Sequence, residues 1–290
     1  MKILVTGASG QLGYDVCREL SRKKMEYVGL SSKTMDITDI SQIHRVFTEN
    51  KPDAVIHCAA YTNVDQAENE PEKCWAVNAV GTQNIALACR SVGAKLLYIS
   101  TDYVFPGTGD QFYEVCDGTS PKNIYGLSKL AGELAVKTLV ENYFIVRASW
   151  AFGCNGENFV KAILRKAQTE KQIDVVNDQI GSPTYTVDLA GLLCDMVVTN
   201  KYGVYHATNE GVCSWAEFAM EILRQSGMDT KVHPVTTADY PSKAIRPKNS
   251  RMCKDRLRQT GFSGLPSWQD ALRRYLQETG HTEQGNTETI

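Results

Sequence analysis

The sequence predicts an α/β protein in which a doubly wound parallel sheet is followed by a smaller C-terminal substrate-binding lobe. Two observations predict the sheet: short apolar runs alternate with segments of helical periodicity, and the first run leads directly into a glycine-rich turn. The lobe is predicted because this alternation loosens beyond about residue 150 into shorter elements separated by prolines. We therefore place a dinucleotide-binding domain at residues 1–150 and the lobe at 151–280, with the segment 181–206 returning to the sheet.

The first predicted strand, residues 2–6, is apolar and is followed by a glycine turn and then by a helical stripe of Leu12, Val16 and Leu20. Glycines at such a turn let the backbone approach a pyrophosphate, and free N–H groups at the helix start favour its negative charge. The spacing is Gly-x-x-Gly-x-x-Gly rather than Gly-x-Gly-x-x-Gly. The residues of this turn that we expect at a dinucleotide are Gly7, Ser9, Gly10, Gln11, Leu12 and Gly13.

Four more short apolar runs predict strands, at residues 27–30, 54–57, 95–99 and 144–147. Helical periodicity separates them, most clearly over the three segments 39–49, 71–91 and 125–141. Because ligands of doubly wound sheets bind beyond the carboxyl ends of the strands, the residues that follow each run are the candidates for a site. These candidates lie at 7–13, 31–33, 59–62, 100–104 and 149–152.

Tyr125 and Lys129 are the most informative pair in the predicted helix over 125–141. A spacing of four residues places both side chains on one face of a helix. An ammonium group beside a phenol favours the phenolate and eases proton transfer at neutral pH, so the pair favours redox chemistry between a carbonyl and an alcohol. A solvated helix face can carry the same spacing, and the functional interpretation therefore depends on the glycine turn upstream.

Composition excludes several classes of function. The formal charge of −2 and the lack of a Lys/Arg cluster exclude nucleic acid as a partner. No apolar run approaches a membrane span, and a strand that starts at residue 2 leaves no space for a signal peptide, so we expect a cytoplasmic protein. The nine scattered cysteines and five histidines lack metal-ligand spacing, which predicts no metal site. The polar residues 281–290 are expected to fray.

Further motifs accompany the glycine turn and the Tyr125/Lys129 pair, at 59–65, 76–78, 100–105, 147–150, 178–184 and 246–250. Taken together and in this order along the chain, these motifs resemble those of the extended short-chain dehydrogenase/reductase superfamily, which has a Rossmann-like fold. Within that superfamily the chain is similar to the family of dTDP-4-dehydrorhamnose reductases, over nearly its whole length.

The resemblance implies a catalytic triad of Thr101, Tyr125 and Lys129. In such a site a nicotinamide delivers hydride to the carbonyl carbon, and Tyr125 gives its proton to the carbonyl oxygen. Lys129 would lower the pKa of the phenol and bind the nicotinamide ribose, while the Thr101 hydroxyl would bind the reacting oxygen. The alternative for Thr101 is a residue at a strand end that caps the following turn.

The residues after Thr101 discriminate among sugar-nucleotide enzymes. Dehydratases of the superfamily place an Asp-Glu pair after the equivalent threonine, whereas this chain has Asp102-Tyr103. The missing glutamate favours a reductase, with Asp102 as a secondary candidate for positioning. We expect NAD(P)H-dependent reduction of the 4-keto group of dTDP-4-dehydro-L-rhamnose to dTDP-L-rhamnose. Another sugar-nucleotide reductase, an epimerase, or a non-catalytic nucleotide-binding regulatory subunit are the alternatives.

The residues after the second predicted strand bear on the choice of cofactor. NAD-selective enzymes commonly place an acidic residue there, and this chain has Ser31, Ser32 and Lys33 instead. Hydroxyls and an ammonium can hold a 2′-phosphate, so we expect NADPH and leave open whether NADH is also accepted. Asp36 and Ile37 are expected beside the adenine, with a helix N-cap at Asp36 or Thr38 as the alternative. Three residues after the third strand complete the expected cofactor site: Ala59, Ala60 and Tyr61.

The substrate side is predicted from fewer signals. Trp150 could stack on the sugar or the base, or be an ordinary buried tryptophan. Arg246 could pair with the diphosphate, and Asn158 could contact the nucleotide or cap a helix. Relatives occur as monomers and as dimers, some bridged by Mg²⁺, so oligomeric state and Mg²⁺ stay open. The expected substrate-binding residues are Thr62, Val64, Thr101, Asp102, Tyr103, Trp150, Asn158 and Arg246.

Overall fold

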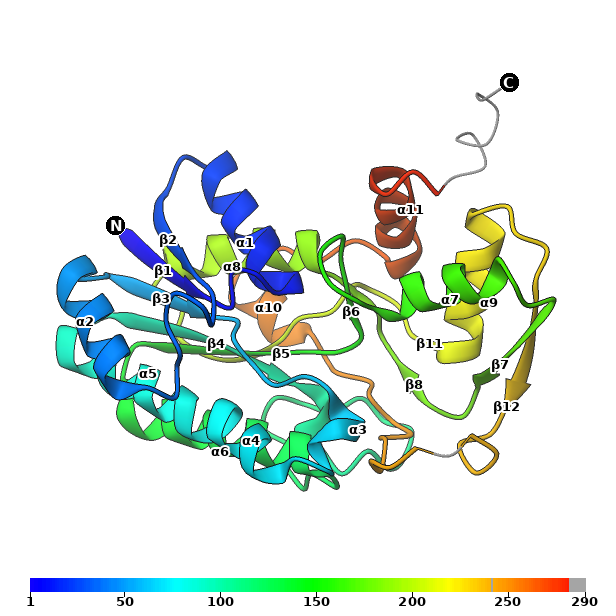
Figure 1. Cartoon of the computed structure of the whole chain (residues 1–290), viewed down its shortest axis with the longest axis horizontal. Coiled ribbons are helices and arrows are strands. Elements are labelled where there is room, and N and C mark those ends of the chain that lie inside the picture. Colours follow the sequence, from blue (N-terminus) through cyan, green and yellow to red (C-terminus); the bar gives the residue numbers. More distant parts are fainter. Residues whose placement is uncertain (241, 282–290) are drawn as a thin grey trace.

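A six-stranded parallel sheet forms the centre of the N-terminal part of the molecule (Figure 1). The computed structural model describes residues 1–240 and 242–281. The strands lie in the order β10-β5-β4-β3-β1-β2, and each neighbouring pair is parallel. Their bounds are β1 (Lys2–Thr6), β2 (Glu26–Leu30), β3 (Ala54–His57), β4 (Lys95–Thr101), β5 (Tyr143–Ala148) and β10 (Gly203–His206).

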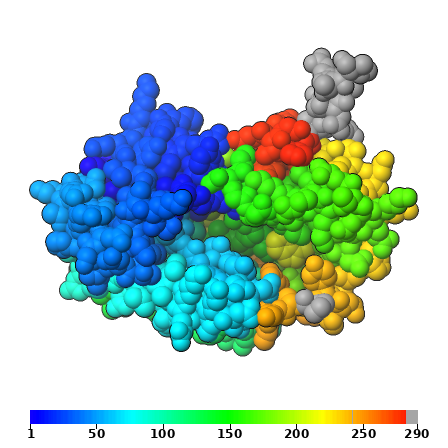
Figure 2. Space-filling view, viewed as in Figure 1, coloured from blue at the N-terminus to red at the C-terminus, as the bar shows by residue number. Residues whose placement is uncertain are grey.

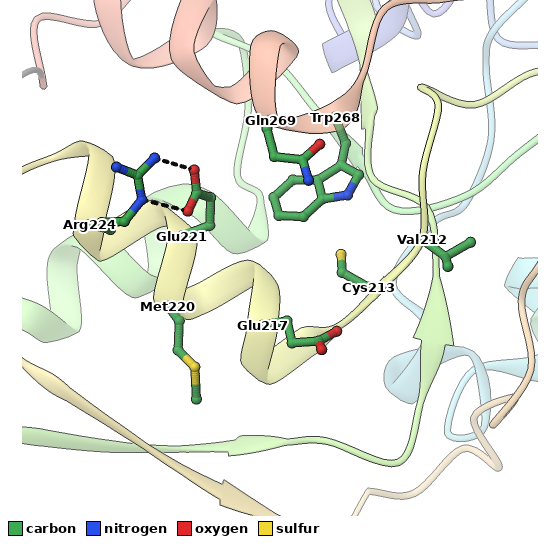
Figure 3. Close-up of a pocket in the computed structure, with 8 residues that line it drawn as sticks. All are labelled: Val212, Cys213, Glu217, Met220, Glu221, Arg224, Trp268 and Gln269. Carbon is green, nitrogen blue, oxygen red and sulfur yellow. Dashed lines mark hydrogen bonds and ion pairs between the residues drawn. The ribbon is translucent and has the colours of Figure 1, made fainter.

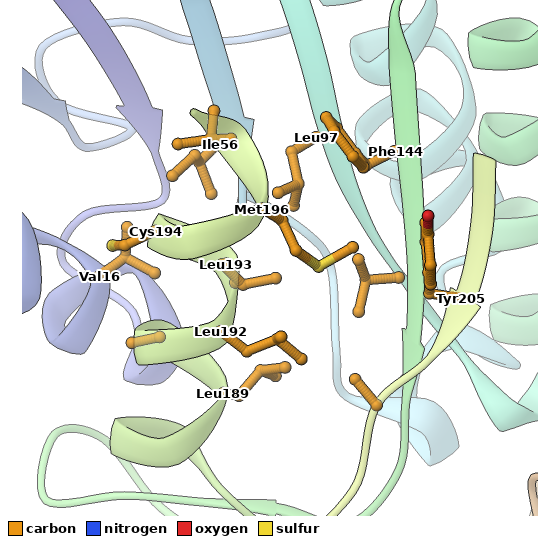
Figure 4. Close-up of a cluster of buried hydrophobic side chains, with 14 of the residues drawn as sticks. Val16, Ile56, Leu97, Phe144, Leu189, Leu192, Leu193, Cys194, Met196 and Tyr205 are labelled. Carbon is orange, nitrogen blue, oxygen red and sulfur yellow. The ribbon is translucent and has the colours of Figure 1, made fainter. Parts of the chain in front are cut away.

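Helices cover both faces of this sheet because successive strand residues point to opposite sides. Ile3 and Val5 of β1 pack into one apolar cluster with Val16 and Leu193, shown in Figure 4. Leu4, between them, packs into a second cluster on the other face. The first face is covered by α1 (Gln11–Arg22) and α8 (Thr186–Val197), and the second by α2 (Ile40–Asn50), α5 (Thr82–Val92) and α6 (Ile124–Leu139).

The five strands predicted from apolar runs are confirmed, as are the helices predicted over 39–49 and 125–141. The segment 181–206 contains α8 and β10, and β10 extends the sheet beside β5. The helix expected over 71–91 is present as an unbroken helical stretch, but its middle turn is π-helical rather than α-helical. That stretch divides into α4 (Pro71–Trp75), a π-helical segment η1 (Ala76–Gly81) and α5.

The π-helical turn carries Asn78, whose side chain contacts two neighbouring segments. The Asn78 amide accepts a hydrogen bond from the Tyr61 backbone N–H at 2.8 Å and donates to the Tyr61 carbonyl at 3.0 Å. It also donates to the Ser128 hydroxyl at 3.0 Å, which ties η1 to α6. Widened turns of this kind occur frequently at functional sites. Asn78 thus fastens the loop after β3 to the helix that carries Tyr125.

The lobe beyond β5 has no large sheet. Its strands pair two by two, as β6 with β9, β8 with β11, and β7 with β12. An aromatic cluster that includes Phe152, Phe218 and Trp268 fills its core. The lobe elements are β6 (Ala151–Phe152), α7 (Phe159–Ala167), β7 (Gln172–Val176), β8 (Ile180–Gly181), β9 (Thr184–Tyr185), β11 (Cys213–Ser214), α9 (Trp215–Gln225), β12 (Lys231–Val235) and α11 (Trp268–Glu278).

Three short helices complete the described residues: α3 (Val64–Ala67), the 3-10 turn η2 (Asp102–Val104) and α10 (Asp255–Gln259). Of the tail predicted to fray, residues 282–290 lie outside the described part of the chain. Among the residues that are described, no helix combines the length and the apolar character needed to cross a bilayer.

Candidate active site

A cavity of about 760 Å³ lies where the carboxyl ends of the sheet strands face the lobe. Figure 2 shows the hollow between these two parts of the molecule. Most residues that we expected at a cofactor or a substrate line this cavity, whereas Gly13, Lys33, Asn158 and Arg246 do not. The expected residues that line it are Gly7, Ser9, Gly10, Gln11, Leu12, Ser31, Ser32, Asp36, Ile37, Ala59, Ala60, Tyr61, Thr62, Val64, Thr101, Asp102, Tyr103, Tyr125, Lys129 and Trp150.

The glycine turn has the shape that a pyrophosphate needs. Gly7 has φ +69°, and a Cβ there would lie 2.7 Å from the Ala59 backbone nitrogen. A Cβ on Gly13 would lie 2.1 Å from the Gly7 carbonyl oxygen, so Gly13 packs α1 against the turn instead of lining the cavity. No side chain caps the start of α1. A tight backbone with an uncapped helix start fits the phosphates of a dinucleotide.

The chain after β2 forms a polar turn at the same cavity. The Thr34 hydroxyl accepts from the Ser31 N–H at 2.9 Å, and the Asp36 carboxylate accepts from the Thr38 N–H at 2.9 Å. The N-cap of α2 is Asp39, which accepts from Ser41 N–H at 2.8 Å, so an N-cap at Asp36 or Thr38 is wrong. Asp36 caps only a local turn, and its remaining carboxylate surface faces the cavity.

Tyr125 is positioned by the first turn of α6. The Asn123 side chain caps this helix by accepting from the Gly126 N–H at 2.7 Å. A Cβ on Gly126 would lie 2.3 Å from the Tyr103 carbonyl oxygen, so only glycine allows α6 to approach η2 this closely. The rings of Tyr125 and Tyr103 meet edge to face with centroids 5.5 Å apart. The residue after Tyr125 therefore has a steric reason to be glycine.

Lys129 lies one turn further along α6 and is 3% exposed. Its ammonium donates to the Ile99 carbonyl at 2.7 Å and lies 4.2 Å from the centre of the Tyr98 ring. Burial lowers the pKa of Lys129 to about 7, and the negative charge of Glu133 opposes that fall. The ammonium is thus held at the end of β4, in the cavity and largely shielded from water.

Burial raises the pKa of the Tyr125 phenol above its usual value, and a hydrogen bond with Thr101 opposes that rise. This differs from the expectation that Lys129 lowers the pKa of the phenol. The physical reason is desolvation of the phenolate, which is the largest influence on this pKa. The Lys129 ammonium is directed at the Ile99 carbonyl instead. Tyr125 is consequently protonated at neutral pH, which is the form that a proton donor needs.

Thr101 ends β4, and its hydroxyl caps the following turn, as the capping interpretation expects. Its contact with a reacting oxygen stays a prediction. The hydroxyl oxygen accepts from the Tyr103 N–H at 3.2 Å, which caps η2, and the hydroxyl donates to the Asp102 carboxylate at 3.0 Å. The same hydroxyl is in hydrogen-bond contact with Tyr125. Thr101, Tyr125 and Lys129 therefore meet at one end of β4, beside the glycine turn.

Comparison with known proteins agrees with this geometry. The family described as RmlD substrate binding domain matches residues 1–281. A dTDP-4-dehydrorhamnose reductase of Streptomyces griseus is 41% identical over 276 residues, which cover 93% of this chain and 91% of that protein. The chain belongs to this family. The resemblance inferred from the sequence motifs is thereby confirmed.

Two further relatives cover almost the same length. The spore coat polysaccharide biosynthesis protein SpsK of Bacillus subtilis is 42% identical over 277 residues, which cover 96% of this chain and 97% of that protein. A crystal structure of dTDP-4-dehydrorhamnose reductase from Bacillus anthracis in complex with NADP has a TM-score of 0.93 at 46% identity. The match covers 96% of this chain and 99% of that one. The expected α/β fold with a parallel central sheet is therefore confirmed.

On the lobe side of this family's site, two stacked tryptophans form a wall of the cavity. The rings of Trp150 and Trp215 lie 3.7 Å apart with an interplanar angle of 13°. Trp150 has φ +49°, and a Cβ on Gly181 would lie 2.9 Å from its ring, so the lobe holds this ring closely. Sequence reasoning missed Trp215, because it begins α9 after a strand of only two residues and no local pattern marks it.

Other lining residues that the sequence did not single out come mostly from apolar strand ends and from the lobe. Apart from the charged Glu157, the side chains at these positions are small or apolar and carry no chemical signal of their own, although several fall in the strand-end groups that ligand-binding rules single out. They are Met35, Cys58, Val77, Ile99, Ser100, Ala148, Ser149, Ala151, Gly156, Glu157 and Leu189.

Arg246 and Asn158 are placed differently from what we expected. Arg246 forms an ion pair with Asp65 at 2.6 Å and donates to the Tyr103 hydroxyl at 3.4 Å, outside the cavity lining. Asn158 caps α7 by accepting from the Lys161 N–H at 3.0 Å, and donates to the Gln11 side chain at 2.9 Å. Both side chains therefore join the lobe to the sheet domain, and the capping interpretation of Asn158 is confirmed.

A second cavity, of about 400 Å³, lies in the lobe between α9 and α11 (Figure 3). Glu221 and Arg224 form a two-point ion pair at its edge, at 2.7 and 2.6 Å. None of the expected site residues line it. Within residues 1–240 and 242–281, no group of three or more His, Cys, Asp or Glu side chains could hold a metal ion.

Proposed function

We propose that this chain reduces the 4-keto group of dTDP-4-dehydro-L-rhamnose to an alcohol with NADPH, giving dTDP-L-rhamnose. The observation that carries the proposal is the meeting of Thr101, Tyr125 and Lys129 at the end of β4, in one cavity with the glycine turn. Membership of a family that includes dTDP-4-dehydrorhamnose reductases supports the same substrate class.

NADPH fits the residues present and would supply the hydride. The backbone of the glycine turn would hold its pyrophosphate, and the Ser31 and Ser32 hydroxyls would hold its 2′-phosphate, since no acidic residue follows β2 directly. Asp36 and Ile37 would lie beside the adenine. The Bacillus anthracis reductase, whose structure contains NADP, supports this choice of cofactor.

In this proposal the residues of the chain donate the proton and stabilise the negative charge that develops in the reaction. As negative charge develops on the carbonyl oxygen, the Tyr125 hydroxyl transfers its proton to that oxygen and becomes a phenolate. The Lys129 ammonium, held at the Ile99 carbonyl, stabilises the phenolate electrostatically. Burial of both groups strengthens this interaction because water no longer screens it.

The sugar nucleotide would lie between the triad and the lobe. Thr62 and Val64 line the cavity after β3, and Tyr103 lines it beside Tyr125. The stacked pair of Trp150 and Trp215 offers an aromatic face to a sugar ring or a base. A reductase needs no additional carboxylate base, and the glutamate of the dehydratases is replaced by Tyr103.

The test is to incubate the full chain with NADPH and dTDP-4-dehydro-L-rhamnose and to follow the absorbance of the reduced nicotinamide. We expect stoichiometric loss of NADPH, with dTDP-L-rhamnose identified by NMR, and slower loss with NADH. A parallel incubation with a uridine-linked 4-keto sugar tests base selectivity. Tight binding of NADPH without its consumption would instead favour a regulatory subunit, and interconversion of two sugars without net oxidation would favour an epimerase.

A further inference from the structure

Asp102 is a buried carboxyl group beside the triad, with 2% of its surface exposed. One carboxylate oxygen accepts from the Thr101 hydroxyl at 3.0 Å, and the other accepts from the Ser250 hydroxyl at 2.5 Å. Backbone N–H groups of Asp102 and Tyr103 also contact it. In the described part of the chain its partners are thus hydroxyl and amide groups rather than cations, an unfavourable setting for a buried negative charge.

The charged and titratable groups around Asp102 come from four neighbouring elements. Tyr103 belongs to η2 itself. Tyr125 and Lys129 belong to α6, and the Lys129 ammonium is directed at the Ile99 carbonyl. Cys74 of α4 faces Tyr125, while Arg246 faces Tyr103 and is neutralised by Asp65 of α3. Burial raises the pKa of Asp102 to about 6, and the hydrogen bonds from Ser250 and Thr101 oppose that rise.

The Thr101 hydroxyl has one hydrogen, so the ionisation state of Asp102 decides where that hydrogen points. An ionised Asp102 accepts the hydrogen, and Thr101 then has only lone pairs to offer to the reacting oxygen. A protonated Asp102 can donate to the Thr101 oxygen across the same 3.0 Å contact, which turns the threonine hydrogen away from Asp102, to the side where Thr101 contacts Tyr125. The second lone pair of Thr101 stays with the Tyr103 N–H, so no heavy atom has to move.

We propose that Asp102 is a positioning residue that acts through Thr101: its protonated carboxyl turns the threonine hydroxyl towards the reacting carbonyl oxygen, and its carboxylate turns it away. The inference rests on the proposed function, because it assigns Thr101 as a donor to a developing oxyanion. Asp102 thereby controls whether the Thr101 hydroxyl can donate a hydrogen bond. Thr101, Tyr125 and Lys129 alone do not provide this control. Ser250, which lies in the lobe between β12 and α10, favours the ionised form by donating to the other carboxylate oxygen.

The direction of the pH dependence follows from which form is competent. With a pKa of about 6, Asp102 is protonated below that pH, and the competent fraction falls about tenfold per pH unit above it. Lys129, with a pKa of about 7, loses its charge in the adjacent range and adds a second alkaline decline. Turnover of the wild-type protein should therefore fall between pH 7 and about 9, with the steeper slope expected when two groups must both be protonated.

Asp102→Asn tests the inference, since the amide N–H₂ can donate permanently to Thr101 while the amide oxygen accepts from Ser250. We expect kcat at pH 8 to equal the wild-type value or to exceed it by up to about a hundredfold. The alkaline decline should then have the shallower slope of a single ionising group. In the Thr101→Val background the same change should have no effect. A lower kcat with the wild-type pH profile would overturn the inference.

Two further measurements keep the test decisive if Asp102→Asn does not fold. Ser250→Ala leaves the Thr101 contact in place and removes a bond that favours the carboxylate, so the alkaline decline should move to higher pH. Carbon NMR of labelled aspartates in the wild-type protein should show one carboxyl that titrates near pH 6. A decline that does not move after Ser250→Ala, or no such titration between pH 5 and 8, would overturn the inference. If NADPH is never consumed, the proposed function fails, while the NMR titration still reports on Asp102.

Discussion

The sheet domain and the lobe differ in how they hold their side of the cavity. The sheet domain places Thr101, Tyr125 and Lys129 on β4 and α6, which continuous backbone hydrogen bonding makes regular. The lobe presents Trp150 from the turn after β5 and Trp215 from the first position of α9, and both rings pack against its aromatic core. The groups proposed for the chemistry thus lie on the sheet domain, whereas the proposed substrate contacts come from both regions: Thr62, Val64 and Tyr103 from the sheet domain and the two tryptophans from the lobe.

The contacts that join the two regions link residues far apart in the chain. Arg246 binds Asp65 and Ser250 binds Asp102, across 181 and 148 residues respectively. Asn158 binds Gln11 across 147 residues. Two of these bonds end on residues that line the cavity, Asp102 and Gln11, so polar contacts help to fix the position of the lobe relative to the triad. Perturbing each region separately should therefore give different signatures.

The largest expected effect is on the sheet side, from Tyr125→Phe. Removing the hydroxyl takes away the proposed proton donor, and kcat should fall by roughly 10²- to 10⁴-fold while NADPH affinity stays unchanged. Steady-state kinetics and fluorescence titration with NADPH measure the two quantities. The control is Tyr113→Phe, whose hydroxyl contacts Thr108 and does not line the cavity. Retention of more than a tenth of the activity in Tyr125→Phe would assign the proton transfer to another group.

Next in size is a stability effect from a buried ion pair of the sheet domain. Glu133 is 0% exposed and binds Arg147 through two contacts of 2.8 Å. Glu133→Gln leaves the arginine charge buried without a counter-charge, so the free energy of unfolding should fall by about 3–5 kcal/mol.

Urea denaturation measures this change, and an exposed ion pair of the lobe provides the control. Arg165→Gln removes the pair with Glu157, whose partners are 66% and 74% exposed, and should change stability by less than about 1 kcal/mol. Equal losses in the two variants would contradict the contrast between a buried and a solvated pair.

Gly126→Ala should separate helix propensity from steric fit. Its Cβ would meet the Tyr103 carbonyl at 2.3 Å, so α6 must move away from η2, at a cost of about 1–3 kcal/mol, with loss of turnover. Gly191→Ala in α8 is the matched control, because no atom lies within 4 Å of the added Cβ. That change should instead stabilise the protein by about 0.5–1 kcal/mol. Thermal unfolding measures both, and the same sign in both variants would refute the steric argument.

The smallest expected effect is on the lobe side, from Trp215→Ala. Loss of the stacked pair with Trp150 removes roughly 0.5–1.5 kcal/mol of aromatic interaction, so KM for the nucleotide sugar should rise about 2- to 10-fold with kcat little changed. Steady-state kinetics at saturating NADPH measure this split. Trp268→Phe, inside the lobe core, checks for general loosening of the lobe. A fall in kcat alone would place Trp215 in the chemistry and remove the distinction between the two regions.

Sequence reasoning reached the sheet domain because its signals are local. Apolar runs predict β1 and β4, the glycine turn predicts the start of α1, and the spacing of Tyr125 and Lys129 depends only on helical geometry. It missed the π-helical turn at 76–81, since the side-chain contacts of Asn78 decide that geometry. The sequence also did not show that burial would raise the pKa of Tyr125, since that burial depends on how distant parts of the chain pack around the phenol.

By itself the sequence determined the α/β class, the order of strands and helices in the sheet domain, and the residue types that can bind a dinucleotide and reduce a carbonyl. The tertiary structure decided that Arg246 pairs with Asp65, that Lys33 does not line the cavity, that Trp215 completes its wall, and that Asp102 lies between Thr101 and Ser250. The physical reason is the separation along the chain of the residues that interact. Secondary structure follows from neighbours along the chain, whereas burial and hydrogen-bond partners depend on side chains that only folding brings together.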